Sequence, residues 1–96
     1  MQNYDFKETG KRIKDLRIRH GISQTELARR VSVNRDHLGK IERGGTGISI
    51  DLAIALANEF HTTLDFIFLG KNYQSNELRR EIYKVIGMME NLAEKL

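Results

Sequence analysis

The chain has 96 residues and a net charge of +3, and it contains no proline, cysteine or tryptophan. This length suits one domain with a modest core, and the absence of cysteine excludes a disulfide framework, a thiolate zinc site and an iron–sulfur cluster. No apolar run approaches the roughly 20 residues of a membrane span, and the N-terminus does not have the composition of a signal peptide, so we expect a cytoplasmic protein.

Capping residues predict five short helices in the first 70 residues. The expected N-caps are Asp5, Ser23, Asn34, Ser49 and Thr63. Glu8 and Glu26 stand three residues after the first two caps, as capping-box partners do. Gly21 follows the end of the first helix, the third helix extends over residues 35–43, and Gly70 ends the fifth. No strand pattern appears.

A sixth helix is predicted over residues 77–96, after a polar linker at 71–76. A heptad seam with 4, 3, 4, 3, 4 spacing, widened by Ile86, supplies the expected dimer interface: Leu78, Ile82, Val85, Ile86, Met89, Leu92 and Leu96. The helix either folds back onto its own domain or pairs with the same helix of a second chain. Pairing is favoured, because a polar linker precedes the helix and Met88 and Met89 suit an adaptable protein interface.

The segment from Gln24 to Arg43 holds two predicted helices that are only a few residues apart. Such a short turn makes the helices cross steeply, as in a helix–turn–helix motif. Ala28 is the small residue expected where the helices touch. The inner faces are apolar and consist of Leu27, Val31, Val33, Leu38 and Ile41.

Three ordered stretches, Arg12–Arg17, Gly21–Ala28 and Leu38–Gly44, resemble the Cro/repressor-type (Xre-like) helix–turn–helix regulators. Thr63–Ile67 resembles the fifth helix of that family, and the similarity covers about 60 residues. The resemblance implies an all-α, five-helix lambda-repressor-like DNA-binding domain over residues 1–70, with the C-terminal helix as an addition. It also implies an ion pair between Arg17 and Glu42.

One residue departs from the family pattern. Ser32 stands in the turn, where the family usually has glycine. Glycine suits a positive φ, and serine would cost about 1 kcal/mol if φ is positive.

A projection of residues 35–43 at about 100° per residue orients the third helix. Leu38 and Ile41 mark its buried side, and the opposite side is polar. In the major groove, we expect Arg35, Asp36, Gly39 and Lys40 to read bases, and Thr25 and His37 to contact the DNA backbone. The resemblance implies that Gln24 contacts the DNA backbone or an adjacent base and that Arg43 contacts phosphate. Two alternatives remain open: Asp36 and Lys40 form an i,i+4 pair on an exposed helix, and Gly39 brings the helix close to the preceding helix rather than to DNA.

The positive charge is concentrated in residues 11–43, which hold ten Lys and Arg and four Asp and Glu. Such a basic segment favours a polyanionic partner. Arg29 and Arg30 are either phosphate ligands or part of a solvated face, whereas Lys11, Arg12 and Lys14 are expected to face solvent. Scattered histidines and the missing cysteines predict no metal site and no cofactor, and no catalytic constellation appears.

The sequence therefore predicts a sequence-specific double-stranded DNA-binding transcriptional regulator that is not an enzyme. We expect a homodimeric repressor that reads a palindromic operator through the major groove. One alternative is an antitoxin-type DNA-binding protein whose C-terminal helix docks a toxin. Another is a protein-interaction module that has lost DNA binding, against which the basic recognition face argues.

Overall fold

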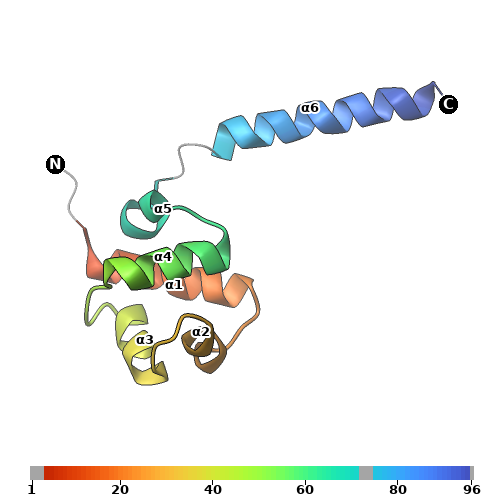
Figure 1. Cartoon of the computed structure of the whole chain (residues 1–96). Coiled ribbons are helices and arrows are strands. Elements are labelled where there is room, and N and C mark those ends of the chain that lie inside the picture. Colours follow the sequence, from red (N-terminus) through yellow and green to blue (C-terminus); the bar gives the residue numbers. More distant parts are fainter. Residues whose placement is uncertain (1–3, 72–74, 96) are drawn as a thin grey trace.

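The computed structural model of the chain describes residues 4–71 and 75–95, with side chains except those of residues 75–78. In these ranges the chain is all-α (Figure 1), as predicted: α1 Phe6–Arg19, α2 Gln24–Arg30, α3 Arg35–Glu42, α4 Ile50–Phe60, α5 Leu64–Leu69 and α6 Ser75–Glu94. The expectations for Leu96 and for the side chain of Leu78 lie outside the described residues. None of the described helices combines the length and apolarity that crossing a bilayer requires.

Each of the five predicted N-caps precedes a helix and accepts a backbone N–H with its side chain. Asp5 Oδ1 accepts from an N–H two residues on at 2.9 Å, and Ser23 Oγ accepts from that of Glu26 at 3.0 Å. A cap of this kind contributes about 1 kcal/mol, because it satisfies a donor without an intrahelical partner. The carboxylate of Glu26, the expected capping-box partner of Ser23, accepts hydrogen bonds from the side chains of Arg29 and Arg30. The five local helix starts were therefore predictable from sequence.

The core lies among α1 to α5, and each of these helices contributes a fully buried side chain to it. The largest apolar ones are Ile13, Leu27, Leu38, Ile41, Leu56 and Ile67. Helix α3 packs against α1 and α2, and α5 packs against α1 and α4. Ala28 is only 3 % exposed and belongs to this core, and Val33 is half-buried against it. The inner face predicted for α2 and α3 is therefore the buried one.

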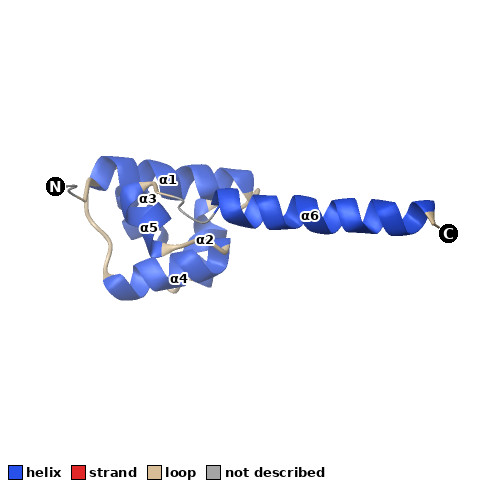
Figure 2. Cartoon of the chain, turned by 90° about the horizontal axis from the view of Figure 1, so that it is seen from above, coloured by secondary structure: helices blue, strands red, loops and turns tan. Residues whose placement is uncertain are grey.

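Helix α6 extends away from the other five helices (Figures 1 and 2) and packs extensively against none of them in the described part of the chain. It begins at Ser75, two residues before the expected start at residue 77. The described apolar side chains of the predicted interface are exposed by 44 to 65 %: Ile82, Val85, Ile86, Met89 and Leu92. The apolar stripe of α6 is therefore uncovered in the single chain.

The turn between α2 and α3 contains a residue in the left-handed region. Ser32 has φ 59°, and the next N–H, that of Val33, donates to the carbonyl oxygen of Ala28 at 3.0 Å. The bond closes the end of α2 and holds Ser32 in a conformation that costs a residue with a Cβ about 1 kcal/mol.

Ser32→Gly should raise the free energy of unfolding by about 0.5 to 1 kcal/mol. Glycine adopts the positive φ freely, and its larger entropy in the unfolded chain offsets part of the gain. Urea denaturation measures the change, with Ser32→Ala as the control that keeps the Cβ. A glycine variant no more stable than the alanine variant would contradict this account of the turn.

Candidate nucleic-acid interface

Helix α3 has one buried side and one open side. The buried residues are Leu38, Gly39, Ile41 and Glu42. The open side carries Arg35, Asp36, His37 and Lys40, and Arg43, the C-cap residue, is exposed beside them. The polar surface predicted for this helix is therefore present, except at Gly39.

The expectation that Gly39 lies on the open side is wrong. A Cβ at this position would lie 3.1 Å from the guanidinium Nη1 of Arg43 and 3.9 Å from the side-chain amide of Gln24. Gly39 is thus covered by these two side chains. Gln24 is the first residue of α2, so a side chain of the preceding helix is one of the two that lie over Gly39.

A buried ion pair joins α1 to the end of α3. Arg17 Nε donates to Glu42 Oε2 at 2.7 Å, and Arg17 Nη2 donates to Glu42 Oε1 at 3.0 Å. The two side chains are only 13 % and 2 % exposed. A third Arg17 donor, Nη1, bonds the carbonyl oxygen of Ile22 at 3.0 Å. This bidentate pair fixes the C-terminal end of α3 against α1.

The same carboxylate orients the start of α2. Gln24 Nε2 donates to Glu42 Oε1 at 3.0 Å, and Gln24 is half-buried. Thr25, the next residue, is exposed. The two residues expected at the DNA backbone from α2 therefore differ, because one is held by Glu42 and the other points to solvent.

The two arginines of α2 are held by neighbouring carboxylates. Arg29 Nε donates to Glu26 Oε2 at 3.0 Å, and Arg30 bridges Glu26 at 2.9 Å and Glu59 at 2.7 Å. The hydrogen bond from Arg29, and to a smaller extent that from Arg30, lowers the pKa of Glu26 to about 2. For this pair the structure supports the solvated, ion-paired face rather than free phosphate ligands.

The charged side chains on the open side of α3 have no such partners. In the ranges that the structure describes, Arg35, Asp36, Lys40 and Arg43 form no ion pair, although the spacing of Asp36 and Lys40 permits one. Three cations and one carboxylate therefore lie on one exposed surface. A polyanion can bind there without breaking ion pairs within the chain.

The expectation that Arg12 faces solvent is also wrong. Arg12 is half-buried, and its Nη1 donates to the carbonyl oxygen of Ile67 at 3.0 Å. Gly70 makes room for it, since a Cβ there would lie 2.7 Å from Arg12 Nε. Arg12 thus stabilises the C-terminal end of α5, whereas Lys11 and Lys14 are exposed as expected.

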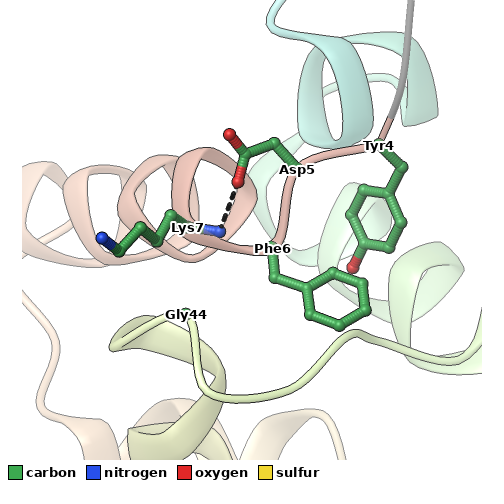
Figure 3. A pocket seen from close by; sticks show the side chains of 5 residues that line it. All are labelled: Tyr4, Asp5, Phe6, Lys7 and Gly44. Atoms are coloured by element: carbon green, nitrogen blue, oxygen red, sulfur yellow. Dashed lines mark hydrogen bonds between the residues drawn. The ribbon is translucent and has the colours of Figure 1, made fainter.

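An open pocket at the start of α1 is lined by Tyr4, Asp5, Phe6, Lys7 and Gly44 (Figure 3). The Tyr4 hydroxyl accepts from the N–H of Ile48 at 3.0 Å, and its ring meets that of Phe68 edge-on at 4.9 Å. Asp5 caps α1. The Tyr4 hydroxyl thus ties the loop between α3 and α4 to the N-terminal segment, and Asp5 is occupied as a cap, so we assign the pocket a structural role.

Comparison with known proteins finds sequences related to the helices described above. A family model described as helix-turn-helix matches residues 13–67. An HTH-type transcriptional regulatory protein of Pyrococcus abyssi is 40 % identical over 55 residues, which are 57 % of this chain but only 17 % of that protein. An uncharacterized HTH-type transcriptional regulator of Archaeoglobus fulgidus is 36 % identical over 58 residues, covering 60 % of this chain and 82 % of the relative. Antitoxin PezA of Streptococcus pneumoniae is 35 % identical over 54 residues, covering 56 % and 34 %.

Solved structures give the same correspondence in three dimensions. The restriction-modification controller protein C.AhdI from Aeromonas hydrophila superposes with a TM-score of 0.62 at 30 % identity, over 67 % of this chain and 97 % of that one. The P22 c2 repressor, solved in complex with a synthetic operator, superposes with a TM-score of 0.63 at 25 % identity, over 66 % and 96 %. Both proteins match about two thirds of the chain described here.

Proposed function

Because the chain belongs to the helix–turn–helix family of the Cro/repressor (Xre-like) type, we propose that it is a sequence-specific double-stranded DNA-binding transcriptional regulator. The family comprises DNA-binding regulators and is not a class of enzymes. The observation that carries the proposal is the open side of α3, whose cations have no anionic partner among the described residues. An exposed helix with unpaired polar side chains suits the major groove.

The side-chain chemistry of α3 suggests a role for each residue. Arg35, in the first turn, presents a planar fork that matches the O6 and N7 acceptors of guanine. Asp36 accepts from cytosine N4 or holds a neighbouring base-reading cation, and Lys40 reaches guanine or phosphate. His37 and Arg43, both exposed, would contact phosphate, and such contacts set the position of the protein on DNA.

At the start of α2, Thr25 and Gln24 would meet the DNA backbone. The Glu42 bond holds the Gln24 amide beside α3, so its contact would be positioned before DNA arrives. Gly39 assists by having no side chain between Gln24 and Arg43. We therefore assign Gly39 a positioning role and no base contact.

The uncovered stripe of α6 supports a homodimer. Two copies related by a two-fold axis would read a palindromic operator, with half-sites one helical turn or a multiple of it apart. Such a dimer, bound over a promoter in the cytoplasm, would repress transcription by excluding the polymerase.

Arg35→Ala should weaken binding to the preferred operator by about 1 to 3 kcal/mol, which is roughly 5- to 150-fold. Binding to unrelated duplex should change much less, because that binding depends on phosphate contacts. Fluorescence anisotropy at fixed salt measures both, with an operator selected from a random DNA pool. Arg29→Ala is the matched control, because it removes the same charge from a residue already bonded to Glu26. Unchanged operator binding by the Arg35 variant would exclude base reading by this residue.

A second candidate function is that of an antitoxin, and the similarity to PezA favours it. In that case the stripe of α6 would bind a toxin, and the DNA-binding surface would repress the operon of the pair. A stable complex of the purified chain with the product of the adjacent gene would support this function. A homodimer that remains intact in the presence of that product would contradict it.

A further inference from the structure

Four exposed apolar side chains form a seam along α6. They are Ile82, Val85, Met89 and Leu92, each 50 to 65 % exposed in the single chain. Their spacing of 3, 4 and 3 residues is that of the a and d positions of a two-stranded coiled coil. A helix with such a seam needs a partner helix that carries a matching seam.

The seam is symmetrical about Gly87. Val85 and Met89 lie two residues on either side of it, and Ile82 and Leu92 lie five residues on either side. We propose that α6 pairs with α6 of a second copy in antiparallel orientation, with the two-fold axis level with Gly87. Ile82 then faces Leu92 of the partner subunit, and Val85 faces Met89 of the partner subunit. This inference rests on the homodimer of the proposed function and adds its direction.

The charges beside the seam suit this direction. With Ile82 and Met89 at a and Val85 and Leu92 at d, Glu81 falls at a g position. Lys95, the residue after the end of α6, falls at the g position two heptads later. In an antiparallel pair the g positions of the two helices adjoin, so Glu81 meets Lys95 of the partner subunit, and symmetry repeats the contact. In a parallel pair, the g position adjoins the next e position of the partner, which would place Glu81 beside an isoleucine, Ile86.

Among the side chains that the structure describes, Lys84 pairs with the Glu81 carboxylate within the chain. Lys84 Nζ lies 3.3 Å from Glu81 Oε1, and the two side chains are 63 % and 64 % exposed. Exposed pairs of this kind contribute little, and the second carboxylate oxygen stays available for Lys95 of the partner subunit.

The other charges of α6 are also distributed unequally on the two sides of Gly87. Before Gly87, the sequence of α6 carries three cations, Arg79, Arg80 and Lys84, and two anions, Glu77 and Glu81. After it, the charges are two anions and one cation: Glu90, Glu94 and Lys95. Antiparallel pairing places these oppositely charged halves together, whereas parallel pairing places like beside like. Near the axis, Ile86 and Met88 would each meet their own copy and widen the apolar centre.

Disulfide trapping tests the direction, because the natural chain has no cysteine and each introduced thiol is unique. Ile82→Cys and Leu92→Cys are purified separately, then mixed and oxidised with glutathione. We expect a mixed disulfide of the two variants and no cross-link in either variant alone, as read by intact mass. The two copies of residue 82 would be about 15 Å apart along an antiparallel pair, too far for a disulfide.

Charge reversal provides a second measurement that needs no oxidation. Glu81→Lys and Lys95→Glu should each weaken dimerisation roughly 3- to 10-fold in analytical ultracentrifugation, and the double variant should restore it. Glu90→Lys is the control for overall charge, because it makes the same change on α6 away from the seam, and its effect on dimerisation should be the smaller one. Circular dichroism verifies that α6 stays helical in each variant.

Self-cross-linked Ile82→Cys or Leu92→Cys would show parallel pairing and overturn the proposal. A wild-type chain that is monomeric in analytical ultracentrifugation, together with no cross-link in the mixed cysteine variants, would overturn it as well. Neither result concerns the open side of α3, whose DNA binding is measured independently with the Arg35 variant. Failure of the antiparallel pair and failure of the proposed function are therefore distinguishable.

Discussion

Gly10→Ala is expected to lower the free energy of unfolding by about 3 kcal/mol or more. Gly10 lies where α1 crosses the end of α3, and a Cβ there would collide with the carbonyl oxygen of Ile41 and lie 3.0 Å from that of Glu42. Both obstacles are backbone atoms, so no side-chain rotation relieves the contact. The two helices must move apart, which loosens the core around Ile13.

Thermal and urea denaturation measure the loss, and the midpoint temperature should fall by roughly 10 °C or more. Gly87→Ala is the matched control, because the same substitution in the middle of α6 meets nothing within 4 Å. There alanine should be neutral or slightly favourable, since it is a better helix former by about 1 kcal/mol. Equal behaviour of the two variants would contradict the close approach of α1 to α3.

Arg17→Ala is expected to cost about 3 to 5 kcal/mol, because it leaves a buried carboxylate without its bidentate partner. The Glu42 side chain is 2 % exposed. After the substitution, the Gln24 amide would be its one remaining side-chain donor among residues 4–71 and 75–95. Urea denaturation at neutral pH measures this loss.

The double variant Arg17→Met with Glu42→Leu separates pairing from packing. It removes both charges and keeps apolar volume, so its loss of stability should be smaller than that of Arg17→Ala. If Arg17→Ala is as stable as the double variant, the ion pair does not dominate this contact.

Sequence alone predicted the helix starts because a cap is a local device. The Asp5 carboxylate bonds an N–H two residues away, and the Ser23 hydroxyl bonds one three residues away. The environments of Gly10 and Arg12 could not be predicted in this way. The acceptor of Arg12 is the Ile67 carbonyl, 55 residues later in the chain, and no local pattern reports such a contact.

The error at Gly39 has a different physical origin. A helical projection uses only the direction in which each residue leaves the helix axis. Even with Glu42 counted as buried, Gly39 lies on the open half of α3 in such a projection. Gly39 is buried because the side chains of Arg43 and Gln24 lie over it, and Gln24 belongs to another helix.

The length of α6 has a consequence for DNA binding if its two copies pair in antiparallel orientation. The helix has 20 residues, about 30 Å, and the five-helix units attach at opposite ends of the pair. The length of α6 then sets the distance between the two DNA-binding surfaces. A related chain with one more heptad in α6 would hold these surfaces about 10 Å, or roughly three base pairs, farther apart. Because about three base pairs are not a full helical turn, such a dimer would no longer fit both half-sites of the same operator.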